Sequence, residues 1–214
     1  MPETTDLSVF LNVGERAAHD VESNLAGIGL TLENCDTVLD FGCGAGRTLR
    51  WLIQQFPHVR FYGADVDPQA IAWTKHHLPG AEFGLNSPTP PIGYPDASFD
   101  FVYIISVFTH LAFELQKLWL TELHRIIRPE GIVLFTVHGE HTWHWLSPDK
   151  LVRLRHDGFL FETSRKLQGI LPDWYHTSFM TEYGVQQLLG QSFRLLAYNH
   201  AGMGYQDVVI AQRN

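Results

Sequence analysis

The chain has 214 residues, a formal net charge of −8 and only two cysteines. This length suits one domain with a full hydrophobic core, and the acidic balance argues against a broad surface for nucleic acid, which requires clustered Lys and Arg. The sparse cysteines, the absence of an 18-residue apolar stretch and the polar first residues predict a cytoplasmic protein without a membrane partner.

A helix is expected over residues 9–25, within an N-terminal helical segment at residues 1–30. A strand at residues 37–39 then runs into the sequence DFGCGAG at residues 40–46, and apolar residues at helical spacing follow up to Phe56. The glycines allow a close approach of a ligand to the backbone. We expect the N–H groups of this turn to be free to bind a carboxylate or phosphate.

The glycine spacing discriminates between cofactors. In a dinucleotide-binding fingerprint the third glycine would come one residue later, where this chain has Arg47. The pattern Asp-x-Gly-x-Gly-x-Gly instead resembles motif I of the class I S-adenosylmethionine-dependent methyltransferases. The resemblance implies a site for S-adenosylmethionine, or its product S-adenosylhomocysteine, that includes five residues of the run: Asp40, Gly42, Cys43, Gly44 and Gly46.

A second strand is expected over residues 59–64, ending at Asp65. An acidic residue at this distance past a glycine loop accepts hydrogen bonds from ribose hydroxyls. Asp67 competes for the role, but it precedes Pro68, so we interpret it as the cap of a helix over residues 69–77. By resemblance, Val66 packs against the adenine ring.

Asn86 ends a third strand, expected over residues 83–86. Many relatives carry at this place an aspartate that contacts the adenine amino group, and the amide oxygen of asparagine can accept the same hydrogen bond. A turn-forming asparagine is the alternative. The proline-rich connector at residues 87–91 should then wrap around the sheet edge near the cofactor.

A fourth strand begins in the run 97–111, whose unbroken apolar character is typical of a central parallel strand. An amphipathic helix over residues 114–127, a turn at 128–131 and a fifth strand over 132–137 follow, in an order that resembles the methyltransferase family. Ser106 is assigned to the cofactor site by this resemblance. Glu130 stands where the family usually has glycine, and we expect little consequence.

Residues 138–180 leave the fifth strand and are rich in aromatic side chains and histidines, which predicts a substrate cap inserted in the domain. His138 and His176 are candidates for a base or a substrate ligand, whereas we interpret His110 as a structural loop residue. A metal site at His138, Glu140, His141 and His144 is disfavoured, because their spacing matches no closed site.

A helix over residues 181–189 and strands near 193–199 and 207–211 complete the expected fold. We therefore predict an α/β domain spanning residues 1–214, with a doubly wound, mostly parallel, Rossmann-like seven-stranded sheet whose last strand is antiparallel. The predicted function is methylation of a small molecule, at oxygen, with assistance from a histidine. Two alternatives are a non-catalytic S-adenosylmethionine-binding protein of the same fold and an aminopropyl-transferase-like enzyme; the acceptor and the oligomeric state stay open.

Overall fold

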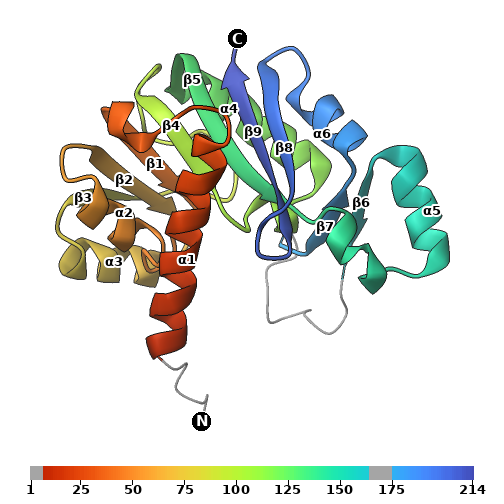
Figure 1. The fold of residues 1–214 in the computed structure, drawn as a ribbon, viewed down its shortest axis with the longest axis horizontal. Coiled ribbons are helices and arrows are strands. Elements are labelled where there is room, and N and C mark those ends of the chain that lie inside the picture. Colours follow the sequence, from red (N-terminus) through yellow and green to blue (C-terminus); the bar gives the residue numbers. More distant parts are fainter. Residues whose placement is uncertain (1–6, 164–174) are drawn as a thin grey trace.

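The computed structural model of the protein describes residues 7–163 and 175–214. A seven-stranded sheet runs through its middle and helices cover both faces (Figure 1). Across this sheet the strands follow the order β3-β2-β1-β4-β5-β9-β8. Their bounds are β1 Thr37–Phe41, β2 Arg60–Asp65, β3 Ala81–Leu85, β4 Phe99–Ile104, β5 Ile127–Val137, β8 Phe193–Met203 and β9 Gln206–Arg213.

The strand directions confirm the predicted fold class. β1 is parallel to β2 and β4, β2 is parallel to β3, and β4 is parallel to β5. β9, the last strand of the chain, lies antiparallel between β5 and β8, with Asp207 opposite Val137. The fold is thus doubly wound and mostly parallel, and its antiparallel pairings come from the final hairpin.

Two apolar layers hold the helices against the sheet. Successive side chains of a strand point to opposite faces, so Val133 and Phe135 of β5 face one layer while Ile132 and Leu134 face the other. α4 and α6 pack on the first layer, and α1, α2 and α3 on the second. The helix bounds are α1 Leu7–Ala26, α2 Leu49–Gln55, α3 Pro68–His77, α4 Phe113–Ile126, α5 Pro148–Asp157 and α6 Glu182–Leu189.

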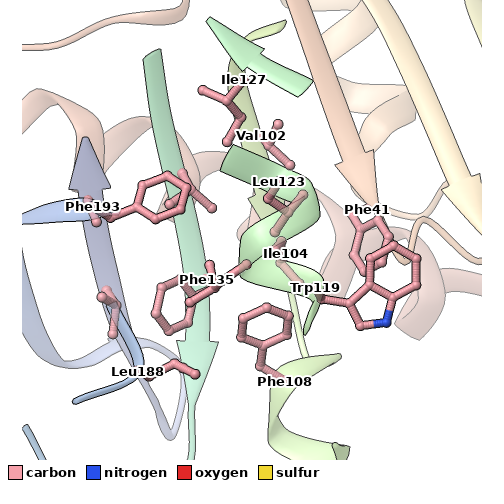
Figure 2. Close-up of a cluster of buried hydrophobic side chains, with 14 of the residues drawn as sticks. Phe41, Val102, Ile104, Phe108, Trp119, Leu123, Ile127, Phe135, Leu188 and Phe193 are labelled. Carbon is pink, nitrogen blue, oxygen red and sulfur yellow. The ribbon is translucent and has the colours of Figure 1, made fainter. Parts of the chain in front are cut away.

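Figure 2 shows the layer against α4 and α6. Trp119 and Leu123 of α4 lie over Ile104 of β4 and Phe135 of β5, and all four side chains are almost wholly buried. Burial of one such side chain contributes about 1.5–3 kcal/mol. Because both faces of β4 and β5 are covered, their sequences read as continuous apolar runs.

The segment at residues 128–131 differs from the expected turn, since it lies inside β5. Ile127 already pairs with Phe99, and after an irregularity in register Ile132 pairs with Phe101. Glu130 takes a left-handed conformation with φ of 63°, which ordinarily favours glycine. Glu130 therefore has a backbone shape that glycine ordinarily adopts.

The cap region, which the sequence placed at residues 138–180, has structure of its own. It contains the 3-10 helix η3 (Glu140–Trp145), α5, and a two-stranded antiparallel sheet of β6 (Phe159–Glu162) and β7 (Thr177–Met180). In Figure 1 these elements lie beside the β8–β9 side of the main sheet. Trp174 and the other residues at 164–174 fall outside the described residues.

Two further observations bear on the sequence-based predictions. Within residues 7–163 and 175–214, no helix has the length and apolar character needed to span a lipid bilayer. Cys35 and Cys43 are both free thiols, and burial raises the pKa of the Cys43 thiol far above its ordinary value. Cys43 is thus held as an uncharged packing residue.

Candidate functional site

A cavity of about 670 Å³ opens at the carboxyl ends of β1, β2 and β4. Open parallel sheets bind their ligands at this edge, where strand order reverses, and the size is that of a small-molecule or cofactor pocket. The cavity is lined by Phe41, Gly42, Gly44, Asp65, Val66, Asp67, Asn86, Pro88, Ile105, Ser106, Val107, Leu111, Trp119 and Tyr175.

The glycine loop between β1 and α2 needs its glycines for two reasons. Gly42, Gly44 and Gly46 all have positive φ, which side chains disfavour. A Cβ atom at Gly42 would also lie 2.2 Å from Val107, and one at Gly46 would lie 2.2 Å from Leu78. The loop can therefore take this path beside the cavity only with glycine at these positions.

The expectation that the loop N–H groups are free is wrong for four of them. The Gly46 N–H donates to the Cys43 carbonyl oxygen at 2.9 Å, and the other three bond to the end of β2. Gly42 and Cys43 donate hydrogen bonds to the carbonyl oxygen of Ala64, at 2.7 and 3.1 Å. Gly44 donates to the Asp65 carboxylate at 2.7 Å. These donors tie the loop to the end of β2, so the loop shapes the cavity more than it offers an anion site.

Asp65 lies at the end of β2 with its carboxylate at the cavity. One oxygen accepts the Gly44 N–H and the other accepts the Asp67 N–H, at 2.9 Å. Each carboxylate oxygen can accept a further hydrogen bond, so two ribose hydroxyls could be bound. Asp67 also lines the cavity, but its side chain accepts the N–H groups of Gln69 and Ala70, which confirms the predicted cap of α3.

Asn86 lines the cavity and carries an unpaired acceptor. Its amide nitrogen donates to the Ser87 carbonyl oxygen at 2.8 Å, while its Oδ1 atom is enclosed and lacks a partner. Buried polar atoms are nearly always paired, so this oxygen fits a ligand that carries an N–H donor. The adenine amino group implied by the resemblance is such a donor.

Three residues assigned to the cofactor site do not line the cavity: Asp40, Cys43 and Gly46. Asp40 is 4% exposed, and burial raises its pKa to about 7, with the Asp65 charge acting in the same direction. These residues lie behind the lining, and a direct contact with a ligand stays a prediction for each.

Sequence reasoning missed the aromatic wall of the cavity. Phe41 and Trp119 have ring centroids 4.6 Å apart, and the Trp119 indole N–H donates to the Pro88 carbonyl oxygen at 3.1 Å. The helical repeat predicts only that Trp119 faces the core. Pro88, by contrast, belongs to the connector that was expected near the cofactor, and Tyr175 to the aromatic cap.

Ser106 lines the cavity in a strained backbone conformation, with φ of 57°. Its N–H donates to Thr136 Oγ1 at 2.8 Å, and its hydroxyl donates to Gln206 Oε1 at 3.1 Å. The second bond joins the end of β4 to the start of β9. The β8–β9 hairpin therefore reaches the rim of the cavity.

Neither His138 nor His176 belongs to the cavity lining, although His176 directly follows Tyr175, which does. His138 is buried, and its Nδ1 donates to the Ser178 carbonyl oxygen at 3.0 Å, so Nε2 keeps its lone pair. Burial lowers the pKa of His138 to about 4. The ring of His176 is buried 6.0 Å from Phe161 of β6.

The central part of the chain matches a known family model. Residues 39–135 match the model of a methyltransferase domain. The chain is 30% identical over 101 residues to a fatty-acid O-methyltransferase of Mycolicibacterium smegmatis, covering 46% of this chain and 36% of the relative. It is 29% identical over 114 residues to a malonyl-[acyl-carrier protein] O-methyltransferase of Halorhodospira halophila, covering 51% and 37%.

The fold has solved counterparts as well. An amino pentose methyltransferase from Micromonospora echinaspora, solved with bound S-adenosylmethionine, superposes with a TM-score of 0.65 at 16% identity and covers 94% of this chain and 92% of that one. At this identity the likeness concerns the fold. The chain spans little more than a third of the length of the two curated relatives.

Proposed function

We propose that the protein transfers a methyl group from S-adenosylmethionine to an oxygen atom of a small molecule, because the chain belongs to the class I S-adenosylmethionine-dependent methyltransferases. The observation that carries the proposal is the cavity at the carboxyl edge of the sheet, which is lined by the Asp65 carboxylate and by Asn86 with its unpaired oxygen. Oxygen is the acceptor atom in the names of both curated relatives.

Cavity residues match the parts of the cofactor. Asp65 would accept the ribose hydroxyls, Asn86 the adenine amino group, and Val66 would pack on the adenine ring. Trp119 and Tyr175 line the same cavity, and aromatic rings of this kind would suit the positive sulfonium because their faces attract cations. When bound, S-adenosylmethionine supplies a methyl group that moves from sulfur to the acceptor oxygen while the hydroxyl proton passes to solvent.

His138 would orient the acceptor hydroxyl. Its Nε2 lone pair can accept a hydrogen bond, and with a pKa of about 4 the ring is neutral near pH 7. Complete proton transfer from a phenol-like hydroxyl of pKa about 10 would cost roughly 8 kcal/mol. His138 therefore aligns and polarises the hydroxyl, and the proton is lost as the methyl group arrives. His176 stays the second candidate for this role.

Calorimetric titration with S-adenosylmethionine and S-adenosylhomocysteine tests the cofactor site. We expect both to bind, and NAD to give no heat of binding. Asp65→Ala should weaken both ligands by about tenfold or more, since a ribose contact is lost. Asp67→Ala is the matched control. The Asp67 side chain also lies at the end of β2, but it caps α3, so its loss should leave the ribose contact in place.

The outcomes separate the two aspartates. If Asp67→Ala weakens binding and Asp65→Ala does not, the ribose assignment is wrong. If neither adenosyl ligand binds, or NAD binds instead, the proposed function fails. Once binding is measured, transfer of an isotope-labelled methyl group to candidate hydroxyl compounds, with His138→Ala and His176→Ala compared, tests the role of each histidine.

A further inference from the structure

The edge of β7 that faces the main sheet is covered by two histidines. The backbone N–H groups of His176 and Met180 donate to the carbonyl oxygens of His110 and His138, at 2.9 and 3.0 Å. In return, Nδ1 of His110 bonds the carbonyl oxygen of His176 at 2.7 Å, and Nδ1 of His138 bonds that of Ser178 at 3.0 Å. The two imidazoles thus dock on two alternate carbonyls, one just before β7 and one within it.

This docking decides the tautomer of both rings. A carbonyl oxygen only accepts, so Nδ1 must carry the hydrogen of each neutral imidazole and Nε2 must carry the lone pair. Burial lowers the pKa of His110 and of His138, so both rings are neutral near pH 7. Each side chain therefore offers one hydrogen-bond acceptor and no further donor.

Both acceptors are available to a ligand. Among the described residues neither Nε2 has a hydrogen-bond partner, and neither belongs to the fully enclosed polar atoms that lack one. The centroids of His110 and His138 are 6.2 Å apart with nearly perpendicular rings. Tyr175, which lines the cofactor cavity, stacks on His110 at 4.3 Å, so the pair adjoins that cavity.

Aromatic rings frame the pair on its outer side. Trp145 and Tyr205, each about half exposed, lie 5.5 and 6.1 Å from the His138 ring. They come from η3 and from the turn of the β8–β9 hairpin, and their own centroids are 5.6 Å apart. A ring-shaped ligand can pack against such exposed aromatic rings while its polar groups reach the histidines.

We propose that His110 and His138 bind the methyl acceptor together, each accepting a hydrogen bond from one of two hydroxyl groups on neighbouring carbon atoms. The acceptor is then a 1,2-diol, and one of its oxygens is the site of methylation; this inference rests on the proposed function. Two acceptors on rings whose centroids are 6.2 Å apart require two donors, which a carboxylate or a phosphate ester does not bring. A metal ion is disfavoured, because the described residues place no group of three or more ligating side chains here.

Binding of simple diols in the presence of saturating S-adenosylhomocysteine tests the inference without turnover. The probes are catechol and cis-1,2-cyclohexanediol, each measured by calorimetry against its one-hydroxyl counterpart, phenol or cyclohexanol. We expect one diol to bind about tenfold more tightly than its counterpart, since one hydrogen bond is added. Preference for catechol points to a flat aromatic acceptor, and preference for the cyclohexanediol points to a saturated ring.

Asparagine separates a structural role from a binding role. Its amide nitrogen occupies the place of Nδ1 and keeps the bond to β7, but it has no atom at the place of Nε2. His110→Asn and His138→Asn should therefore each abolish the diol preference while S-adenosylhomocysteine still binds. His124→Asn, on α4 against Phe193, is the matched control and should retain the preference.

The contrary results are distinct. No binding of S-adenosylhomocysteine would overturn the proposed function itself. Binding of S-adenosylhomocysteine without any diol preference, or a preference that survives both asparagine variants, would overturn the diol inference and leave the histidines as caps of β7. If a variant fails to fold, ¹⁵N NMR of the wild-type histidines replaces it: the two Nε2 resonances should move on addition of the preferred diol, and unmoved resonances refute the contact.

Discussion

Replacing Asp40 with asparagine should change how the stability of the protein depends on pH. The Asp40 carboxyl is 4% exposed at the end of β1, and burial raises its pKa to about 7. In the unfolded chain the same carboxyl has a pKa of about 3.9. Between these two values the folded state holds a proton that the unfolded state has lost, so stability falls as pH rises through this window.

The magnitude follows from the size of the shift. Three pKa units correspond to about 4 kcal/mol between the fully protonated and fully ionised limits. About 2.5 kcal/mol of this loss lies between pH 5 and pH 8, because the unfolded carboxyl is already largely ionised at pH 5. Asparagine carries no proton to lose, so the wild type should lose about 2.5 kcal/mol more than Asp40→Asn over this range.

Urea denaturation of both proteins at half-unit intervals from pH 5 to pH 8 measures the difference. Comparing the two profiles cancels the titration of groups that both proteins share. Asp36→Asn is the control, because the Asp36 side chain lies just before β1 and is 81% exposed, and its profile should run parallel to the wild type. If the stability of Asp40→Asn also changes with pH in parallel with the wild type, the reasoning that burial disfavours the ionised Asp40 carboxyl is refuted.

The remaining predictions concern the frame of the site. Asp100 accepts hydrogen bonds from the Thr37 N–H and hydroxyl, and these bonds lower its pKa although burial alone would raise it. Asp100→Asn should therefore lower the free energy of unfolding by about 1–3 kcal/mol at pH 7. In acid denaturation this difference between variant and wild type should vanish as the pH falls through the folded pKa of Asp100. Gly46→Ala should destabilise the fold more than Gly44→Ala, because its Cβ would meet Leu78 at 2.2 Å while a Cβ at Gly44 meets nothing within 4 Å; equal urea midpoints would contradict this. In calorimetry, Gly44→Ala is expected to weaken S-adenosylhomocysteine, since Gly44 lines the cavity.

The order of strands and helices could be predicted because each depends on neighbouring residues. The glycine run needs positive φ at Gly42, Gly44 and Gly46, and Asp67 with Pro68 starts α3, both of which are local requirements. Asp65 could be assigned for the same reason, as it ends a strand directly beyond the loop. The irregular pairing at residues 127–132 could not, because it depends on register against Phe99 and Phe101.

The parts of the site that meet through space lie beyond such patterns. Trp119 and Tyr175 are far apart in the chain and enter one cavity only because α4 and the segment before β7 meet at the same sheet edge. Likewise, nothing near Asn86 in the sequence indicates that its oxygen is left without a partner. Enclosure and unpaired polar atoms are properties of the packed chain.

The amino-acid sequence by itself determined the α/β class, the glycine loop and the acidic residue at the end of β2, because periodicity and backbone conformation are set by adjacent side chains. Only the tertiary structure decided that His110 belongs with His138, since both rings bond the backbone at the start of β7, one from the short helix after β4 and the other from the end of β5. Their tautomers follow from carbonyl oxygens 66 and 40 residues away along the chain. A hydrogen bond over that separation exists only once the sheet has brought the strand ends together.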